Sequence, residues 1–188
     1  MRRPAKKTGA MVAEVERMTA YVALLRAVNV GGTGKLPMSM LAGMCEAAGF
    51  VQVRTYIASG NVVFRSDGTE DQIRSALEDR LRTYAGKSVG VLVRTASEMA
   101  DVLARNPFSA SPGNRVAVLF VNGSLPLDPL DGVTGAKSEQ IHLGKRELFV
   151  LYPEGMATTR LRIPSEKHGT ARNMNTVAKL AEMAAALA

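Results

Sequence analysis

The sequence predicts an α+β protein with a ferredoxin-like first half and a second, smaller α/β unit. The first half reads as β-α-β-β-α-β, which is the order of a split βαβ unit. The second half again supplies strands and helices in a mixed order, without an obvious internal repeat. With 188 residues, 46% hydrophobic and 22% charged, the chain is long and apolar enough for one large domain or two small ones.

One stretch near the start of the chain organises the predicted first half. Residues 21–28 form an apolar run typical of a central strand, and residues 29–35 form a glycine-rich loop. Pro37 then opens a helix at residues 38–48, and Gly49 closes it. The apolar residues of this helix recur at helical spacing and predict one buried face: Met38, Leu41, Met44, Cys45 and Ala48.

Three further strands and a second helix complete the predicted first subdomain, residues 19–94. Residues 53–57 and 62–65 read as two strands of a hairpin, and residues 89–94 as a fourth strand. Between them, residues 70–84 predict a helix that buries Ile73, Leu77 and Leu81. On its exposed side, Glu70–Arg74 and Glu78–Arg82 have the spacing of favourable ion pairs.

The predicted second subdomain covers residues 95–188. Thr95 and Glu98 have the spacing of a capping box and predict a helix that ends at Ala104. Residues 115–121 predict an apolar strand, residues 125–133 a weak helical turn, and residues 140–143 and 147–152 a hairpin. The last helix is expected from about Arg172 to Leu187.

Charge and composition indicate which cellular compartment and which kinds of partner to expect. The net charge is +7, but +3 of it belongs to the first 17 residues, and we expect residues 1–18 to be a mobile tail. The charge of the remainder is therefore a weak argument for nucleic acid. There is no apolar run long enough to cross a membrane, and the single cysteine excludes an internal disulfide, so we expect a cytoplasmic protein.

One face of the first predicted sheet carries arginines, and we expect it to be the face without helices. Alternation along the strands places four of them on that face: Arg26, Arg54, Arg65 and Arg94. Such a face could hold phosphates or an acidic partner, or it could be covered by the second half. Because only Tyr56 would be available to stack on bases, recognition of RNA in the manner of related sheets is disfavoured.

The glycine-rich loop is the first candidate binding site. Backbone N–H groups between a strand and a helix can hold an anion, although glycines in a tight turn also serve backbone geometry alone. The loop is neither a P-loop nor a dinucleotide fingerprint, because those patterns need glycine or hydroxyl residues where the chain has Asn29, Leu36 and Pro37. Two polar clusters could converge on it: Ser59-Gly60-Asn61, and the segment from His168 to Asn175 at the start of the last helix.

Three motifs make the chain similar to a known family. RAVNVGG with KLPM, then RTYIASGNVVF, then ARNMNTVAKL closely resemble the bacterial family catalogued as domain of unknown function 1697, over residues 18–187. The resemblance implies two ferredoxin-like subdomains and supplies no reaction. The last motif of the family normally has tryptophan where this chain has Met174, which weakens any stacking role there.

No catalytic or metal-binding constellation is evident in the sequence, and no cofactor is expected. Cys45 belongs to an apolar helix face and is interpreted as a packed thiol. Ser59 lacks the Gly-x-Ser-x-Gly context of a nucleophile elbow, although a triad with His168 remains open. The enzyme alternative is an activity on a nucleotide or other phosphorylated substrate, with Lys35 and Arg172 stabilising charge and His168 as acid or base.

The favoured hypothesis is non-catalytic binding of an anion, either a phosphorylated small molecule or a nucleic-acid backbone, with no membrane association. A protein-interaction module on the arginine-bearing face is a further alternative, and the sequence does not indicate an oligomeric state. The predicted ligand-binding residues are Arg26, Asn29, Gly31, Gly32, Lys35, Ser59, Gly60, Asn61, Arg172, Asn173 and Asn175.

Overall fold

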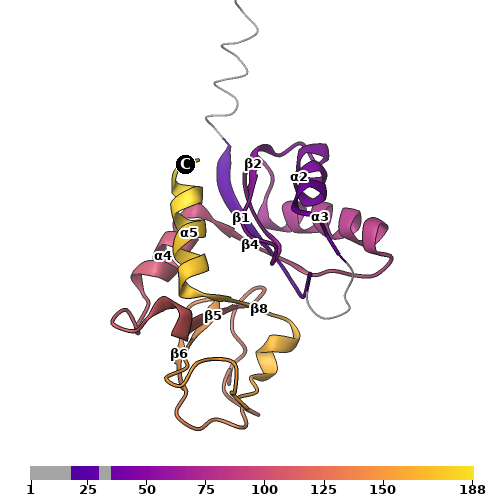
Figure 1. The fold of residues 1–188 in the computed structure, drawn as a ribbon. Helices are drawn as coiled ribbons and strands as arrows, with labels where there is room; N and C mark the ends of the chain where they lie inside the picture. The colour runs from indigo at the N-terminus through magenta and orange to yellow at the C-terminus, as the bar shows by residue number, and fades with distance from the viewer. Residues whose placement is uncertain (1–17, 30–34) are drawn as a thin grey trace, which may run out of the picture.

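The computed structural model describes residues 18–29 and 35–188, and in this part of the chain two four-stranded antiparallel sheets are accompanied by four α-helices (Figure 1). The predicted tail, apart from Met18, lies outside the described residues. So do Gly31 and Gly32 of the glycine-rich loop.

The first sheet has the strand order β2-β3-β1-β4, with every neighbouring pair antiparallel. Helix α2 connects β1 to β2 and helix α3 connects β3 to β4, as the sequence predicts. The elements are β1 (Thr19–Leu25), α2 (Met38–Ala47), β2 (Val51–Thr55), β3 (Asn61–Ser66), α3 (Glu70–Ala85) and β4 (Val91–Thr95).

Alternation along β1 divides the first sheet into two apolar faces. Tyr21, Ala23 and Leu25 point to one side, where they form a core with the buried faces of α2 and α3. Leu41 and Cys45 of α2 belong to this core, which confirms the helix face that the sequence predicts. Burying these side chains contributes on the order of 25 cal/mol per Å² of apolar surface removed from water.

The opposite face of the first sheet is covered by helices of the second half, so the expectation of a face without helices is wrong and the alternative of coverage by the second half is confirmed. Val22, Leu24 and Leu92 form one buried core with residues of α4 (Ala96–Ala104) and α5 (Met174–Ala185). Figure 1 shows these two helices on the side of the sheet away from α2 and α3. The alternating strands are apolar on both faces because both faces are buried.

The second sheet repeats the strand order of the first, as β6-β7-β5-β8, again with antiparallel pairs. Its strands are β5 (Val116–Phe120), β6 (Gln140–Leu143), β7 (Glu147–Leu151) and β8 (Thr170–Asn173). The connections from β5 to β6 and from β7 to β8 are described in full and contain no α-helix. The helical turn expected at 125–133 is wrong, because Pro126 and Pro129 leave bends and turns there.

The two halves share one core rather than meeting through a linker. Thr95 is both the last residue of β4 and the N-cap of α4. Val118 and Phe120 of β5 are buried in the same cluster as Val22 and Leu24 of β1. A separate apolar layer, with Leu148 and Val150 of β7, lies on the far face of the second sheet under the long connections.

None of the helices in the described residues is long and apolar enough to cross a membrane.

Candidate functional site

Segments far apart in the sequence meet at the C-terminal end of β1, and Arg172 of β8 joins them. Its Nε donates to Oδ1 of Asn61 at 2.6 Å, and its Nη2 donates to the carbonyl oxygens of Leu25 at 2.8 Å and Ser59 at 2.9 Å. Its Nη1 donates to the hydroxyl of Thr170 at 2.7 Å. The structure therefore brings together four predicted site residues: Ser59, Gly60, Asn61 and Arg172.

Arg172 is committed to these internal bonds. Its side chain is 9% exposed, and every nitrogen of the guanidinium donates to a protein oxygen. Burial lowers the pKa of Arg172 to about 10, because a buried cation is poorly solvated. This arginine holds the polypeptide together and leaves no nitrogen without a protein partner for an anion.

Gly60 lets the hairpin between β2 and β3 approach β1 closely. It has φ +77°, and a Cβ there would lie 2.4 Å from Cγ2 of Val28 and 2.8 Å from Cβ of Leu25. The amide of Leu25 donates to the carbonyl of Gly60 at 2.8 Å. Only glycine has both the backbone freedom and the missing side chain that this contact requires.

Arg26 fixes the segment before β8. Its Nε donates to the carbonyl of Gly169 at 2.9 Å and its Nη2 to the carbonyl of Lys167.

His168, between these two residues, is exposed and has no side-chain hydrogen bond to any described residue. The hydroxyl of Ser59 accepts a hydrogen bond from Nδ2 of Asn61 at 2.9 Å. The described contacts therefore do not pair Ser59 with His168.

The backbone after β1 is held in an unfavourable conformation. Ala27 has φ +46°, in the left-handed region that residues with a Cβ seldom adopt, and Asn29 has φ +56°, which asparagine tolerates better than alanine. The Asn29 side chain secures this turn, because its Oδ1 accepts from the amide of Leu36 at 2.8 Å and its Nδ2 donates to the carbonyl of Ala58 at 2.7 Å. Strain of this kind is concentrated at functional sites.

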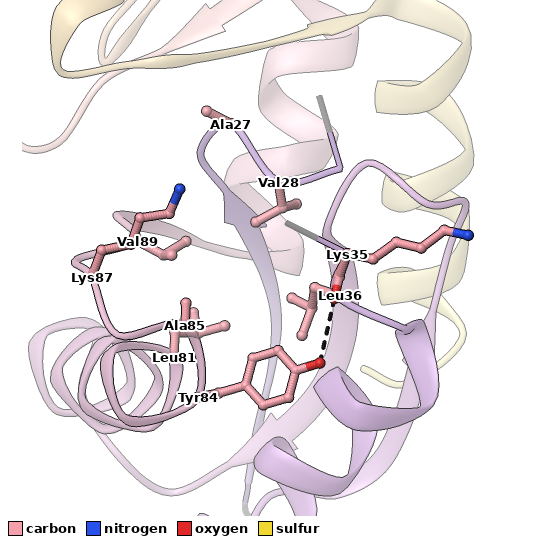
Figure 2. Close-up of a pocket in the computed structure, with 9 residues that line it drawn as sticks. All are labelled: Ala27, Val28, Lys35, Leu36, Leu81, Tyr84, Ala85, Lys87 and Val89. Atoms are coloured by element: carbon pink, nitrogen blue, oxygen red, sulfur yellow. Dashed lines mark hydrogen bonds between the residues drawn. The ribbon is translucent and has the colours of Figure 1, made fainter. Parts of the chain in front are cut away.

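A pocket of about 280 Å³ opens beside this strained turn (Figure 2). The hydroxyl of Tyr84 donates to the carbonyl of Lys35 at 3.3 Å and so joins α3 to the segment before α2. The lining residues are mostly apolar, with two lysines: Ala27, Val28, Lys35, Leu36, Leu81, Tyr84, Ala85, Lys87 and Val89.

The two lysines stand at the edges of this pocket rather than on its floor. Figure 2 shows Lys87 at one side and Lys35 at the other, with the Lys35 side chain extending away from the cavity. Val28, Leu36 and Leu81 supply the apolar wall between them. A concave apolar surface with a few charged groups at its rim is the usual form of a small-molecule site.

The last two predicted site residues, Asn173 and Asn175, lie at the start of α5. Oδ1 of Asn173 accepts from the amide of Thr176 at 2.9 Å, so Asn173 is the N-cap. Asn175 packs against Gly113, where an added Cβ would lie 2.1 Å from its Oδ1. Neither residue lines the pocket.

Tyr84 and Lys87 are not among the residues predicted for the site, although the strand topology indicates that they lie close to it. Strand β4 is antiparallel to β1, so the start of β4 must lie beside the end of β1. Lys87 and Val89 precede β4 directly, and Tyr84 is in the last turn of α3. The end of α3 and the loop after it therefore had to lie near the end of β1.

Arg94, one of the four arginines of the predicted sheet face, is buried inside the protein. Arg94 is 1% exposed and donates to the carbonyls of Val121 at 2.7 Å and Arg146 at 3.0 Å, both in the second half. Its guanidinium carbon lies 5.6 Å from the centre of the Phe120 ring. Burial lowers the pKa of Arg94. Around Arg94 the face is therefore an interior contact between the two halves, whereas Arg54 on β2 is exposed.

The described residues offer no metal centre and no activated thiol. They contain no group of three or more His, Cys, Asp or Glu residues that could hold a metal ion. Burial raises the pKa of Cys45 to about 12, so its thiol is protonated at neutral pH. Met174, which stands where the resembling family has tryptophan, is buried in the shared core.

The fold and the pocket define an α/β protein of two antiparallel sheets with a basic-rimmed apolar cavity. The family described as "Protein of unknown function (DUF1697)" matches residues 18–149, and the chain belongs to this family. The match includes the first two sequence motifs; the third, residues 171–180, lies outside it.

A solved structure supports the same architecture. The conserved bacterial protein SP0830 from Streptococcus pneumoniae is similar with a TM-score of 0.74 and 26% identity, over 88% of this chain and 98% of that one. No protein with curated function matches the chain.

Proposed function

We propose that this protein is a non-catalytic binder of a small phosphorylated molecule, which it holds in the pocket between Lys35, Tyr84 and Lys87. The observation that carries the proposal is the pocket itself: an apolar cavity beside a strained turn, with a lysine at each edge. An apolar wall takes an uncharged part of the ligand, and a lysine at the rim takes its phosphate.

The concave shape favours a small molecule over a nucleic-acid backbone. A backbone is bound along an extended basic surface, often with aromatic side chains stacked on bases. The pocket has about 280 Å³ and one aromatic residue, Tyr84, whose hydroxyl is bound to Lys35. Of the predicted glycine-rich loop, Lys35 lines the pocket and Asn29 holds the neighbouring Leu36 through its side chain, whereas residues 30–34 lie outside the described part of the chain.

Two broader expectations accompany this function. The first half has the strand order and helix positions of a ferredoxin-like unit, and the second half has its strand order, so we infer that both derive from that architecture. The single, buried cysteine suits a reducing compartment, and we propose the cytoplasm.

The experiment is calorimetric titration with phenyl phosphate, compared with inorganic phosphate and phenol. Phenyl phosphate should bind more tightly than either, because it alone satisfies both the lysines and the apolar wall. Lys35→Ala and Lys87→Ala should each weaken binding by up to about fivefold, the range for exposed charge pairs. Bound ligand should also raise the melting temperature.

Lys137→Ala is the matched control, because Lys137 is an exposed lysine that does not line the pocket. It should bind phenyl phosphate like the wild type. An equal loss in all three variants would indicate nonspecific charge attraction and would refute the site. Tighter binding of an oligonucleotide, falling steeply with salt, would support nucleic acid instead.

A further inference from the structure

A second, larger cavity runs between α2 and α3. It measures about 550 Å³ and is open to solvent. Met40 and Tyr84 are 45% and 44% exposed at its margins, which is unusual for large apolar side chains that face one groove. The residues that line it are Ser39, Met40, Gly43, Met44, Ala47, Asp79, Arg80, Thr83 and Tyr84.

The groove exists because α2 presents small residues toward α3. Ser39, Gly43 and Ala47 recur every four residues and so lie on one side of the helix. A Cβ added at Gly43 would meet no atom within 4 Å, so the space above this residue is open. Arg80 Nη2 donates to the carbonyl of Ala47 at 2.8 Å and so joins α3 to the end of α2, and the Tyr84 hydroxyl donates to the carbonyl of Lys35 in the segment before α2.

The groove and the lysine-rimmed pocket meet at Tyr84, which lines both. Charge is distributed unequally between them. The pocket has two lysines and no acidic residue, whereas in the groove Asp79 is paired with Arg82 at 2.6 Å and Arg80 donates to backbone carbonyls. One end therefore attracts an anion, and the other offers an apolar channel whose charged groups already have partners.

We propose that the α2–α3 groove holds the alkyl chain of an amphipathic anion whose head group is the phosphate of the proposed function, on which this inference rests. From Ser39 to Ala47 the groove is about 12 Å long at 1.5 Å per residue, enough for a medium-length chain. The ligand class is then an alkyl or acyl phosphate rather than a phosphorylated sugar. Met40 and Met44 suit an alkyl chain, because their flexible side chains adapt to its shape.

The test compares butyl phosphate, decyl phosphate and decanol by titration calorimetry below their micellar concentrations. Each methylene that enters the groove should tighten binding about threefold to fourfold, so decyl phosphate should bind far more tightly than butyl phosphate. The groove would be refuted as a site for the alkyl chain if chain length had no effect on affinity or if decyl phosphate did not bind.

The Gly43→Leu variant tests the groove independently of the pocket. The added side chain fills open space and replaces glycine within a helix, so the melting temperature should be unchanged or higher. The preference for decyl over butyl phosphate should disappear, while binding of phenyl phosphate should remain. Ser75→Leu places the same side chain on an exposed position of α3 outside the groove and should retain the preference.

Failure of the pocket and failure of the groove give different results. If decanol binds as tightly as decyl phosphate and Lys87→Ala weakens neither, the groove holds a chain but the phosphate site is refuted. If Gly43→Leu keeps the chain-length preference, the groove proposal is refuted and the phosphate site is unaffected. If Gly43→Leu instead abolishes self-association and no chain-length effect exists, the occupant is a second copy of the protein, which also overturns the proposal.

Discussion

The buried guanidinium of Arg172 shows how a residue suited to ligand recognition can be used inside the protein. Its planar fork matches carbonyl oxygens as well as phosphates, and here it donates to Leu25 and Ser59 in the first half. Removing it would leave the Ser59 carbonyl and Asn61 Oδ1 without this donor, whereas the Leu25 carbonyl would keep the Thr170 hydroxyl at 3.3 Å. An unsatisfied buried polar group costs about 1–3 kcal/mol.

Arg172→Met should therefore lower the free energy of unfolding by about 2–6 kcal/mol, because two acceptors lose their donor at about 1–3 kcal/mol each. Methionine keeps much of the side-chain volume, so the loss reports the hydrogen bonds rather than a large cavity. Urea denaturation at neutral pH, followed by circular dichroism, measures the change. Arg54→Met removes an exposed arginine of β2 and should change stability by no more than about 0.5 kcal/mol. Equal effects of the two substitutions would contradict the structural role of Arg172.

At this scale the sequence indicates which residues are unusual but not what they contact. The excess of donors around Arg172 is visible in the sequence, and the structure brings Ser59, Gly60 and Asn61 to it. Whether those donors meet a ligand or a carbonyl depends on atoms more than a hundred residues away. Local periodicity carries no information about such contacts.

Helix starts are the elements that the sequence describes best, because their signals are local. Thr95 and Glu98 form the predicted capping box of α4, with the Thr95 hydroxyl accepting from the amide of Glu98 at 3.1 Å. Thr69 and Gln72 form a second capping box at α3. Glu98 has an additional partner, because its carboxylate lies 2.9 Å from Nη1 of Arg146. Burial opposes ionisation of Glu98, but hydrogen bonds from Thr95 and Arg146 outweigh it and lower its pKa below the ordinary 4.5.

Glu98→Gln should make the stability of the protein less dependent on pH in the acid range. A carboxyl group whose folded pKa is lowered contributes stability above its unfolded pKa and loses it as pH falls through the folded value. The variant keeps an N3 side chain that can accept from the N-cap amide, as Gln72 does in α3, but loses the charge. The difference in unfolding free energy from wild type should be largest near pH 7 and shrink below about pH 4.5. Urea denaturation at pH 7, 5, 4 and 3 measures it, and a constant difference would rule out the ion pair as its source.

Elements defined by distant partners are harder to predict. Strand β8, Thr170–Asn173, was expected to be the start of the last helix, because four residues give too short a pattern and the strand exists only by pairing with β5. The expected Glu70–Arg74 and Glu78–Arg82 pairs do not form. Arg74 and Arg82 pair with Asp71 and Asp79 instead.

Over the whole molecule, the two halves are joined by both core and charge. Arg146 in the second half binds Glu70 at the start of α3 at 2.6 Å and Glu98 at the start of α4 at 2.9 Å. These contacts raise the pKa of Arg146, the hydrogen bond to Glu70 foremost. Val22 and Leu24 of the first sheet would be exposed to water without α4 and α5. Neither half buries all of its apolar surface by itself, so the protein should unfold as one cooperative unit.

Cys45 gives a direct test of this cooperativity. Its thiol is fully buried between α2 and the first sheet, so a thiol reagent should label it only when the first half opens. Leu148 lies in the separate apolar layer of the second sheet, away from Cys45. Leu148→Ala should destabilise that layer by about 2–5 kcal/mol. If the halves unfold together, the urea midpoint for Cys45 labelling should fall by the same amount as the midpoint seen by circular dichroism.

The outcome distinguishes one cooperative unit from two domains that merely touch. In independent domains, a cavity in the second half would leave Cys45 labelling at the wild-type urea concentration and would split the circular dichroism transition in two. Leu77→Ala is the reciprocal variant, because Leu77 is buried with Cys45 in the first half, and amide exchange of β7 then reports the second half. If the two halves share one core, each substitution should lower the protection from exchange or labelling in the opposite half as much as in the half that carries the substitution.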